Sequence, residues 1–342
     1  MNKVRFGKTG LMVSRIAFGG IPIERLSVSD AVDVIRGSIA LGVNFIDTAN
    51  GYTDSEEKIG NAIKNMPRKN LVIASKSFAR DKKTFNEHLE LSLKRLGTDY
   101  IDIYQHHNIS NPECFEKIMG PGGSFEGMKE AINAGKVRHP GFTGHNIPMA
   151  VEIMKTGHFS SVQLAINYVD NEAAKEAIPL AKELDIGFIA MKPFGGGRLP
   201  GAELALKYLL QFDNIIPDPG IQKLSEMEEI IQILESGKTL TAEDAVQIEK
   251  IKTELGKHWC HCCDYCQPCP QNIGIGTVLS LNSFINRLPR PRVLAFAEKQ
   301  MENALSCTQC GECTSRCPYD LNVPELIKEK LDVWNAYLKS SE

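Results

Sequence analysis

Short apolar runs alternate with amphipathic stretches over about the first 237 residues of the chain. The apolar runs have the length of buried β-strands and lie at 15–20, 42–49, 71–76, 100–107, 138–144, 161–167, 186–193 and 214–220. Between and after them, apolar residues recur at helical spacing, and residues such as Ser27 and Gly97 stand where a helix N-cap and C-cap belong. Eight strand-then-helix units predict an α/β fold, a (β/α)8 TIM barrel.

A doubly wound parallel sheet is the other fold that such an alternation suits. It seldom needs eight units, and it favours a glycine-rich phosphate turn after its first strand, which the segment FGGIPIER (18–25) lacks. Pro140 falls inside the fifth predicted strand, where it removes a hydrogen-bond donor. The barrel remains the prediction, with specificity loops expected at 22–26, 108–124 and 194–201 and a flexible entrance segment at 120–127.

The strand pattern ends near residue 240, and the side-chain chemistry changes with it. From about 241 onwards the pattern predicts helices separated by two cysteine-rich segments. Nine of the ten cysteines lie between Cys260 and Cys317, whereas Cys114 stands alone. We therefore predict two domains, a barrel over 1–240 and a small, mostly helical metal-binding domain over 241–342.

The composition argues against a nucleic-acid-binding protein and against a membrane-spanning one. With 42% hydrophobic residues, 24% charged residues and a formal net charge of -3, the chain has an ordinary globular composition and no basic face for nucleic acid. No apolar run is long enough to span a bilayer, and the first residues do not match a targeting peptide. We expect a cytoplasmic protein whose clustered cysteines bind metal, with neither nucleic acid nor a membrane as partner.

Polar side chains occupy the predicted carboxyl ends of three successive strands. Asp47 and Tyr52 follow the second strand, Lys76 ends the third, and His106 and His107 end the fourth. Active sites of such barrels lie at this end, so these groups are expected to converge. Their types suit proton donation to a carbonyl during hydride attack. The Lys76 ammonium is expected to lower the pKa of Tyr52, and Asp47 to orient Lys76.

These segments resemble the aldo-keto reductase family. The resemblance is carried by NFIDTANGYTDSEEKIGNAI (44–63), LVIASK (71–76), DYIDIYQHH (99–107), GKVRHPGFTGHN (135–146) and VQLAINY (162–168). It implies a catalytic tetrad of Asp47, Tyr52, Lys76 and His107, in which the spacing of DYIDIYQHH selects His107 rather than His106. It also implies a nicotinamide cofactor, NADP or NAD, and a small carbonyl or alcohol as substrate.

The resemblance further implies where the cofactor binds. Thr143 and Gln163 would hold the carboxamide, and Met191 replaces the aromatic residue that usually stacks under the nicotinamide ring. The loops at 192–198 and 220–230 would enclose the phosphates and adenosine, with contributions from Lys192, Gly220, Lys223 and Glu226. An acid such as Glu226 near the ribose suits a 2′-hydroxyl better than a 2′-phosphate, which leaves both NADP and NAD open.

The two cysteine motifs have the spacing of iron–sulfur proteins. Cys307, Cys310, Cys313 and Cys317, followed by a proline, match the bacterial ferredoxin run, and the first motif is one residue shorter before its last cysteine. Paired CxxC motifs also make zinc sites, which is the alternative. In two-cluster ferredoxins the fourth cysteine of each run binds the other cluster. The prediction is one [4Fe–4S] cluster on Cys260, Cys263, Cys266 and Cys317 and a second on Cys307, Cys310, Cys313 and Cys269, with a one-cluster version still open.

Taken together, these features predict an iron–sulfur oxidoreductase with NAD(P)-dependent carbonyl reduction or alcohol oxidation in the barrel and electron-transfer clusters in the tail. The alternative is a nicotinamide-binding redox sensor or regulatory protein with structural or sensory clusters. A hydride carries two electrons and a cluster accepts one. Electron transfer between the nicotinamide site and the clusters therefore needs a mediator. A flavin would serve, although no flavin motif stands out, and an electron-transfer protein is the other candidate partner.

Overall fold

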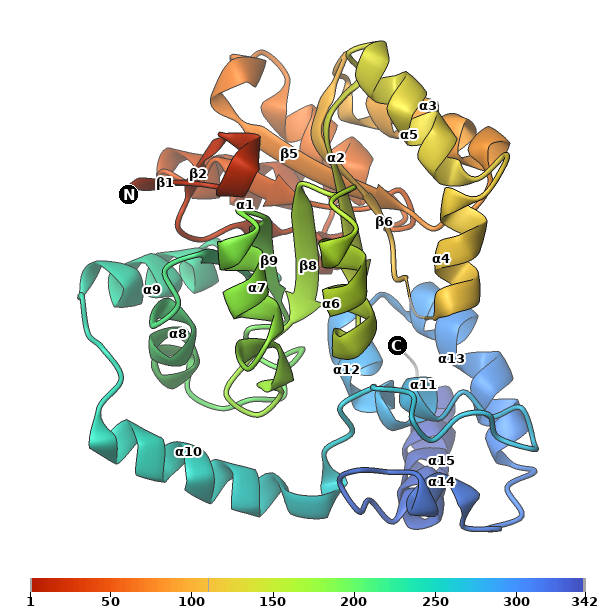
Figure 1. Cartoon of the computed structure of the whole chain (residues 1–342). Helices are drawn as coiled ribbons and strands as arrows, with labels where there is room; N and C mark the ends of the chain where they lie inside the picture. The colour runs from red at the N-terminus through yellow and green to blue at the C-terminus, as the bar shows by residue number, and fades with distance from the viewer. Residues whose placement is uncertain (1, 110, 341–342) are drawn as a thin grey trace. The chain divides into compact units, whose positions relative to one another are not determined.

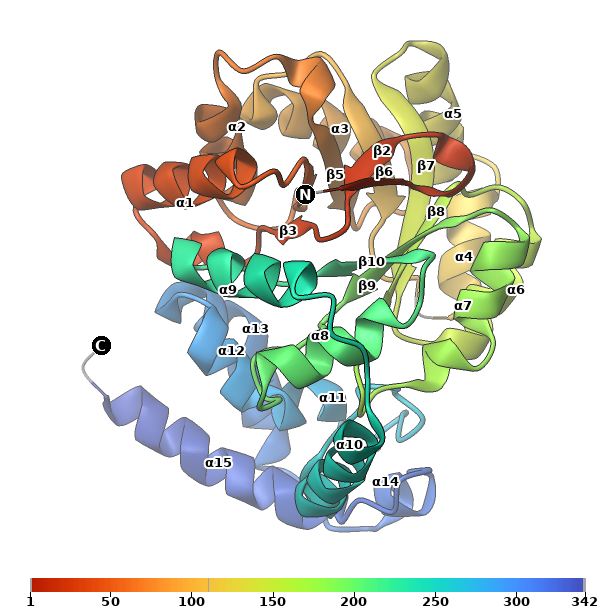
Figure 2. The same ribbon diagram turned by 90° about the vertical axis from the view of Figure 1, so that its left-hand side faces the viewer.

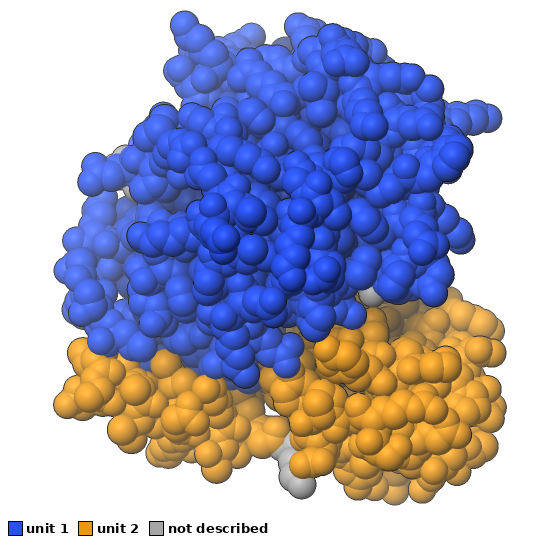
Figure 3. Space-filling model, viewed as in Figure 1, with its two compact units in different colours: residues 1–240 blue, residues 241–342 orange. Residues whose placement is uncertain are grey.

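The chain forms two compact units, residues 1–240 and 241–342 (Figure 3). The structure is a computed structural model that describes residues 2–109 and 111–340. Each unit has its own buried apolar core.

Eight parallel strands form the centre of the first unit (Figure 1). They pair in chain order as β3 (Phe18–Gly19), β4 (Phe45–Asp47), β5 (Val72–Ser77), β6 (Ile101–His106), β7 (Val137–Gly144), β8 (Ser161–Ala165), β9 (Gly187–Met191) and β10 (Ile215–Asp218). Backbone hydrogen bonds of 2.9 Å from Ala17 N to Pro217 O and from Gly19 N to Pro219 O join the first strand to the last. The predicted (β/α)8 barrel is therefore confirmed.

Helices cover the outside of the strands and bury their apolar faces against them. They are α1 (Val28–Ala40), α2 (Ser55–Ile63), α3 (Lys82–Leu96), α4 (Pro112–Met119), α5 (Ser124–Asn133), α6 (Ile147–Lys155), α7 (Ala177–Glu183), α8 (Ala202–Leu210) and α9 (Leu224–Glu235). The predicted loop at 108–124 and entrance segment at 120–127 are wrong in part. Asn111 caps α4 by accepting from the Cys114 N–H, and the buried Phe125 anchors the start of α5.

A short hairpin that the pattern did not predict closes the amino-terminal end of the barrel (Figure 2). It pairs β1 (Lys3–Arg5) with β2 (Met12–Ser14). The Phe6 ring that follows β1 packs on Phe45, with ring centres 5.4 Å apart, and joins a small cluster inside the barrel. Because this end is plugged, the carboxyl ends of the strands, called the barrel mouth below, are the open end.

Pro140 fits its strand without loss of a ladder bond. Its carbonyl accepts from Ser160 N at 2.9 Å, so its polar backbone atoms face β8. The β7–β8 ladder begins only at the next residue, where Gly141 pairs with Ser161. The missing N–H therefore points beyond the end of the neighbouring strand.

The second unit is helical, as predicted, over the residues that the structure describes. Its helices are α10 (Ala242–Leu255), α11 (Ile275–Leu279), α12 (Leu281–Arg287), α13 (Arg290–Ala304), α14 (Glu312–Ser315) and α15 (Val323–Lys339). The first cysteine segment lies between α10 and α11, and side chains of α13 hold its end: Gln300 accepts from Gly274 N, and Asn303 donates to Asn272 O at 2.8 Å. None of the described helices, in either unit, is long and apolar enough to cross a membrane.

Candidate active site and cluster-binding tail

The barrel mouth brings together the side chains that the sequence placed at separate strand ends. Asp47 is the last residue of β4, Lys76 lies near the end of β5, and His107 directly follows β6. Tyr52 lies in the turn between β4 and α2, where its N–H donates to Ala49 O at 2.9 Å. All four groups therefore line one end of the barrel.

Lys76 and Asp47 form a buried ion pair. Lys76 Nζ lies 2.5 Å from Asp47 Oδ2 and 2.8 Å from the carbonyl of Thr48, and both charged side chains are at most 4% exposed. Burial on its own lowers the pKa of Lys76, but the charge of Asp47 and the hydrogen bond to its carboxylate raise it, and the net pKa lies above its ordinary value. The ammonium thus stays charged and fixed in place.

Tyr52 lies next to that ammonium, with Lys76 Nζ 5.2 Å from the centre of the phenol ring. Burial raises the pKa of Tyr52 more than Lys76 lowers it, and Asp47 and Asp218 raise it further. The expectation that Lys76 lowers this pKa is correct for that one interaction but wrong for the net shift. The phenol consequently keeps its proton at neutral pH and can donate it.

The adjacent histidines His106, at the end of β6, and His107, directly after it, face opposite layers. His106 is fully buried among Phe85, Phe125 and Phe159 on the helix side, where burial lowers its pKa to about 3. His107 faces the mouth: its ring centre lies 5.9 Å from that of Tyr52. Because successive side chains of a strand alternate in direction, only one of the pair reaches the site, and it is His107.

The predicted carboxamide residues lie on the next two strands of the same mouth. Thr143 of β7 pairs in register with Gln163 of β8, and both side chains are buried. Thr143 Oγ1 accepts from Asn108 N at 2.8 Å, which leaves its hydroxyl proton available. Gln163 Nε2 donates to Asp47 Oδ2 at 3.3 Å and to Asp218 Oδ2 at 3.1 Å. Within the described residues, its buried Oε1 has no hydrogen-bond donor.

The remaining predicted cofactor residues lie further out on the carboxyl-terminal side of the strands. Met191 is the half-buried last residue of β9, and Lys192 follows it in a left-handed conformation with φ of 57°. Gly220 bridges to Gly19 where the barrel closes. Lys223 is exposed just before α9.

Glu226 has a local partner that the sequence did not reveal. Its Oε2 accepts from Gln222 N at 2.7 Å and from Lys223 N at 3.0 Å, so the carboxylate satisfies backbone donors at the start of α9. Its predicted place beside a ribose stays a prediction, and a ribose hydroxyl would have to share this carboxylate with the helix.

Three residues of the mouth were not identified from the sequence. Asp218 ends β10, Glu24 is buried in the 3-10 helix η2 (Pro22–Arg25), and Phe78 stacks on the His107 ring with centres 3.9 Å apart. The rule that found Asp47, a polar residue at a strand's carboxyl end, applies equally to Asp218. Phe78 follows β5, and 48% of its surface is exposed. Because its ring stacks on His107, it forms part of the side of the site next to that histidine.

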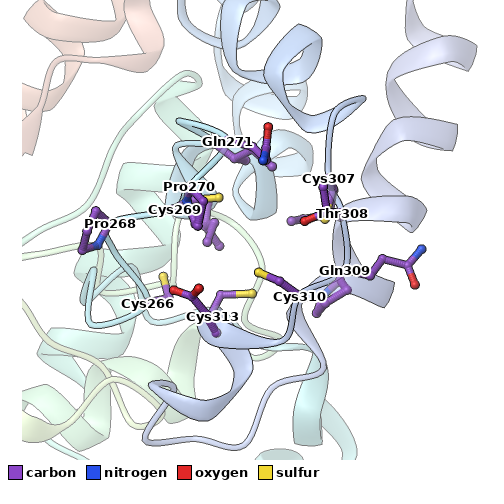
Figure 4. Close-up of a pocket in the computed structure, with 15 residues that line it drawn as sticks. Cys266, Pro268, Cys269, Pro270, Gln271, Cys307, Thr308, Gln309, Cys310 and Cys313 are labelled. Carbon is purple, nitrogen blue, oxygen red and sulfur yellow. The ribbon is translucent and has the colours of Figure 1, made fainter.

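Two cavities in the tail are lined by the predicted metal ligands. One is lined by Cys260, Cys263, Cys266 and Cys317, which are the four thiols assigned to the first cluster. The other is lined by Cys269, Cys307, Cys310 and Cys313, the set assigned to the second, and also by Cys266. Figure 4 shows the sulfur atoms of Cys310 and Cys313 directed toward this second cavity.

This division fits crossed ligation, because the lining of each cavity includes the three predicted thiols of one motif and the predicted fourth thiol of the other. Arg316 joins the two motifs: it donates to Pro268 O at 2.9 Å and to Glu312 Oε2 at 2.6 Å. No three Cys, His, Asp or Glu side chains of the described residues converge on a single metal ion. Four cysteine thiols are the ligand set of a [4Fe–4S] cluster.

Cys262 also lines the first cavity, with its sulfur 3.2 Å from Ser280 Oγ. It lies between the ligand positions 260 and 263 and is outside the four-cysteine pattern. Cys114 belongs to α4 in the barrel and packs against the outer core.

Comparisons with known proteins address both units. The model of the Aldo/keto reductase family matches residues 15–203, and that of the 4Fe-4S dicluster domain matches residues 259–322. The NADH-specific methylglyoxal reductase of Escherichia coli is 28% identical over 254 residues, which cover 63% of this chain and 77% of that protein. The matched stretch spans 61% of the length of another curated relative, from Glycine max.

Solved structures share the barrel. The holo form of an aldo-keto reductase from Bacillus halodurans has a TM-score of 0.63 and 25% identity, and the match covers 73% of this chain and 96% of that one. An aldo/keto reductase from Klebsiella pneumoniae, solved with NADP and acetate, has a TM-score of 0.63 at 21% identity over 73% of this chain and 95% of that one. The chain belongs to the aldo/keto reductase family, whose members are NAD(P)H-dependent oxidoreductases, and carries a 4Fe-4S dicluster domain in its tail.

Proposed function

We propose that the barrel reduces small carbonyl compounds with NADPH or NADH, or oxidises the matching alcohols. The observation that carries the proposal is the buried group at the mouth, in which Lys76 is paired with Asp47 at 2.5 Å and lies 5.2 Å from the Tyr52 ring centre. The family membership of the chain supports the same reaction.

Tyr52 is the proton donor in this scheme. Its raised pKa keeps the phenol protonated, and the neighbouring ammonium of Lys76 stabilises the phenolate that remains after transfer. Asp47 keeps Lys76 charged and oriented. His107, stacked on Phe78, is placed to donate a hydrogen bond to the substrate oxygen.

The mouth also has groups that suit a nicotinamide. Gln163 Oε1 is buried without a donor among the described residues, which fits the N–H of a carboxamide, and the hydroxyl of Thr143 is available on the adjacent strand. When bound, the cofactor supplies the hydride. Glu226 favours a free 2′-hydroxyl, whereas Lys192 and Lys223 favour a 2′-phosphate, so NAD and NADP are both candidate cofactors.

Eight of the nine thiols that line the two tail cavities, all but that of Cys262, are proposed to hold the two clusters in the crossed arrangement. When bound, the clusters supply one-electron transfer. We propose that they lie off the carbonyl–nicotinamide path, because a hydride moves two electrons together and no one-electron step is needed at Tyr52. Reduced thiols and clusters of this kind suit the reducing conditions of the cytoplasm.

The test of the carbonyl reaction compares Tyr52→Phe with wild type over a panel of aldehydes and ketones, using anaerobically purified protein with NADH or NADPH. Loss of the general acid is expected to lower turnover by about 10²–10⁴-fold with nucleotide affinity nearly unchanged. Tyr208→Phe, on α8, is the matched control. Equal turnover in the Tyr52→Phe variant would contradict the assignment. Nucleotide binding without turnover of any carbonyl by wild type would favour a redox sensor instead.

A second measurement tests the place of the clusters. NADPH or NADH is added to the holoprotein without oxygen, mediator or flavin, and the cluster absorption is followed during carbonyl turnover. The absorption is expected to stay that of the oxidised clusters. Rapid bleaching in flavin-free protein would place the clusters on the path.

A further inference from the structure

A second carboxylate, Asp218, is built into the barrel mouth beside the proposed nicotinamide site. It ends β10 and is 7% exposed. Its Oδ2 accepts from Gln163 Nε2 at 3.1 Å, and the same nitrogen donates to Asp47 Oδ2 at 3.3 Å. Gly19 leaves room for it, since a Cβ there would lie 3.0 Å from Asp218 Oδ1.

This arrangement fixes the direction of the Gln163 amide. A side-chain amide has a donor end and an acceptor end, whereas an ionised carboxylate only accepts. With two carboxylates on one side, Nε2 has to face them and Oε1 has to face away. Oε1 is buried and has no donor among the residues described. Gln163 is therefore held as a hydrogen-bond acceptor for an N–H group that arrives at the mouth.

Asp218 also changes the charge balance of the mouth. Lys76 is already paired with Asp47, so the second carboxylate adds negative charge at the same end of the barrel. Its effect reaches the catalytic groups, because it raises the pKa of both Tyr52 and Lys76. The buried Glu24 adds to the rise at Tyr52.

We propose that Asp218 is a positioning and specificity-determining residue that orients Gln163 toward a carboxamide N–H and makes the mouth favour the oxidised, cationic nicotinamide over the reduced, neutral ring. This inference rests on the proposed function. Opposite charges attract more strongly in a poorly solvated site than in water, and only the oxidised ring would carry a positive charge. The mouth thus retains oxidised nucleotide more tightly than it would with a neutral residue on β10.

The test measures the dissociation constants of NADP+, NADPH, NAD+ and NADH for the anaerobic holoprotein without carbonyl substrate, so that no hydride moves. Asp218→Asn keeps an oxygen that accepts from Gln163 but removes the charge. The ratio of Kd for the oxidised form to Kd for the reduced form is expected to rise about tenfold. The matched control is Asp213→Asn, an exposed carboxylate shortly before β10, which is expected to leave the ratio unchanged.

Asp218→Leu separates the two roles. It removes the acceptor as well as the charge, so it is expected to weaken binding of both redox forms in addition to changing their ratio. If Asp218→Asn binds both forms with the wild-type ratio, the inference is wrong while the proposed function stands. If wild type binds none of the four nucleotides, the proposed function fails and the inference fails with it. Asp218→Asn is nearly isosteric with the wild type and is expected to fold. The test of the charge of Asp218 therefore rests on this variant, even if Asp218→Leu does not fold.

Discussion

The barrel mouth and the cysteine-rich tail organise their reactive side chains in different ways. In the mouth the protein itself supplies the partners: Lys76 is bonded to Asp47 and to a backbone carbonyl, and Gln163 bridges two carboxylates. Each of these side chains belongs to a residue within a strand or directly after one. The site is therefore set by the fold before any ligand binds.

In the tail the reactive thiols lie on segments with little regular structure. Residues 259–274, which hold the first motif, contain no helix or strand. Their thiols surround cavities, and burial raises the pKa of Cys266 to about 12, which favours the protonated thiol when no metal is bound. Iron has to displace those protons, so the geometry of this region depends on the metal. The chemistry of the barrel mouth thus depends on the protonation of its own side chains, whereas the structure of the tail depends on bound iron.

Removal of iron is expected to have the largest effect and to be confined to the tail. Chelation should open the cysteine segments while the barrel stays folded, since binding energy of the metal contributes to folding only there. Both tryptophans, Trp259 and Trp334, are buried in the tail, so their emission should shift to the red. Limited trypsin digestion should then cut first at Arg316, which bridges the two motifs in the intact tail. First cuts within the barrel strands would contradict the expectation that the effect of iron is confined to the tail.

Cysteine replacements sharpen the assignment of ligands within the tail. Cys317→Ser is expected to lose about half of the bound iron and to spare the cluster on Cys307, Cys310, Cys313 and Cys269. Cys262→Ser, at the same cavity but outside the pattern, should keep all of it. Iron and sulfide counts with electron paramagnetic resonance check both variants. Loss of the second cluster instead, in Cys317→Ser, would overturn the crossed arrangement.

Removing the ion pair between Lys76 and Asp47 tests how much this pair stabilises the barrel. Lys76→Met leaves Asp47 charged, buried and unpaired, which is expected to cost about 3–5 kcal/mol of unfolding free energy. Adding Asp47→Asn should recover part of that loss. Lys182→Met breaks the exposed pair with Asp213 and should cost less than about 1 kcal/mol. The free energy of unfolding of the barrel in each variant is measured by urea unfolding, with hydrogen exchange of barrel peptides as the readout. The iron content of each variant is expected to stay constant.

Much of the fold and site could be predicted from the sequence because of one geometric rule. Parallel strands of a barrel all end at the same face, so polar residues after apolar runs converge even when they are far apart along the chain. Asp47, Lys76 and His107 follow this rule, whereas Gln163, the third residue of β8, is implied by the family resemblance. The cysteine spacing likewise identified the cluster domain, since cluster ligands need that spacing.

Other features required the folded chain. The strands of the β1–β2 hairpin are three residues each, too short for a periodic pattern. The net pKa shift of Tyr52 depends on burial and on carboxylates from other strands, which no local motif reveals. Glu226 could serve a ribose or a helix start, and only the structure shows that it caps α9.

The smallest effect expected concerns the proton sensitivity of the barrel. His106 is buried among aromatic rings, and its pKa is lowered to about 3, far below the ordinary value of about 6.5 in the unfolded chain. Above pH 6.5 the His106 ring is neutral in both the folded and the unfolded chain, so its protonation does not change the stability of the barrel. Below it the unfolded chain takes up a proton that the folded one refuses, so stability falls as pH falls, until about pH 3. Each unit of pH in that window costs up to about 1.4 kcal/mol for this ring.

His106→Phe should therefore lose less stability between pH 6.5 and pH 5 than wild type does, by about 2 kcal/mol. Urea unfolding of the barrel at the two pH values gives the difference, and comparison within each protein removes any constant effect of the substitution on packing. His158→Phe is the control, because water reaches the His158 side chain in the folded state as well. His145, whose pKa burial also lowers to about 3, should leave part of the acid sensitivity in the His106→Phe variant. An acid dependence identical to that of wild type would show that protons act elsewhere in the barrel, and the contrast with the iron-dependent tail would lose its basis.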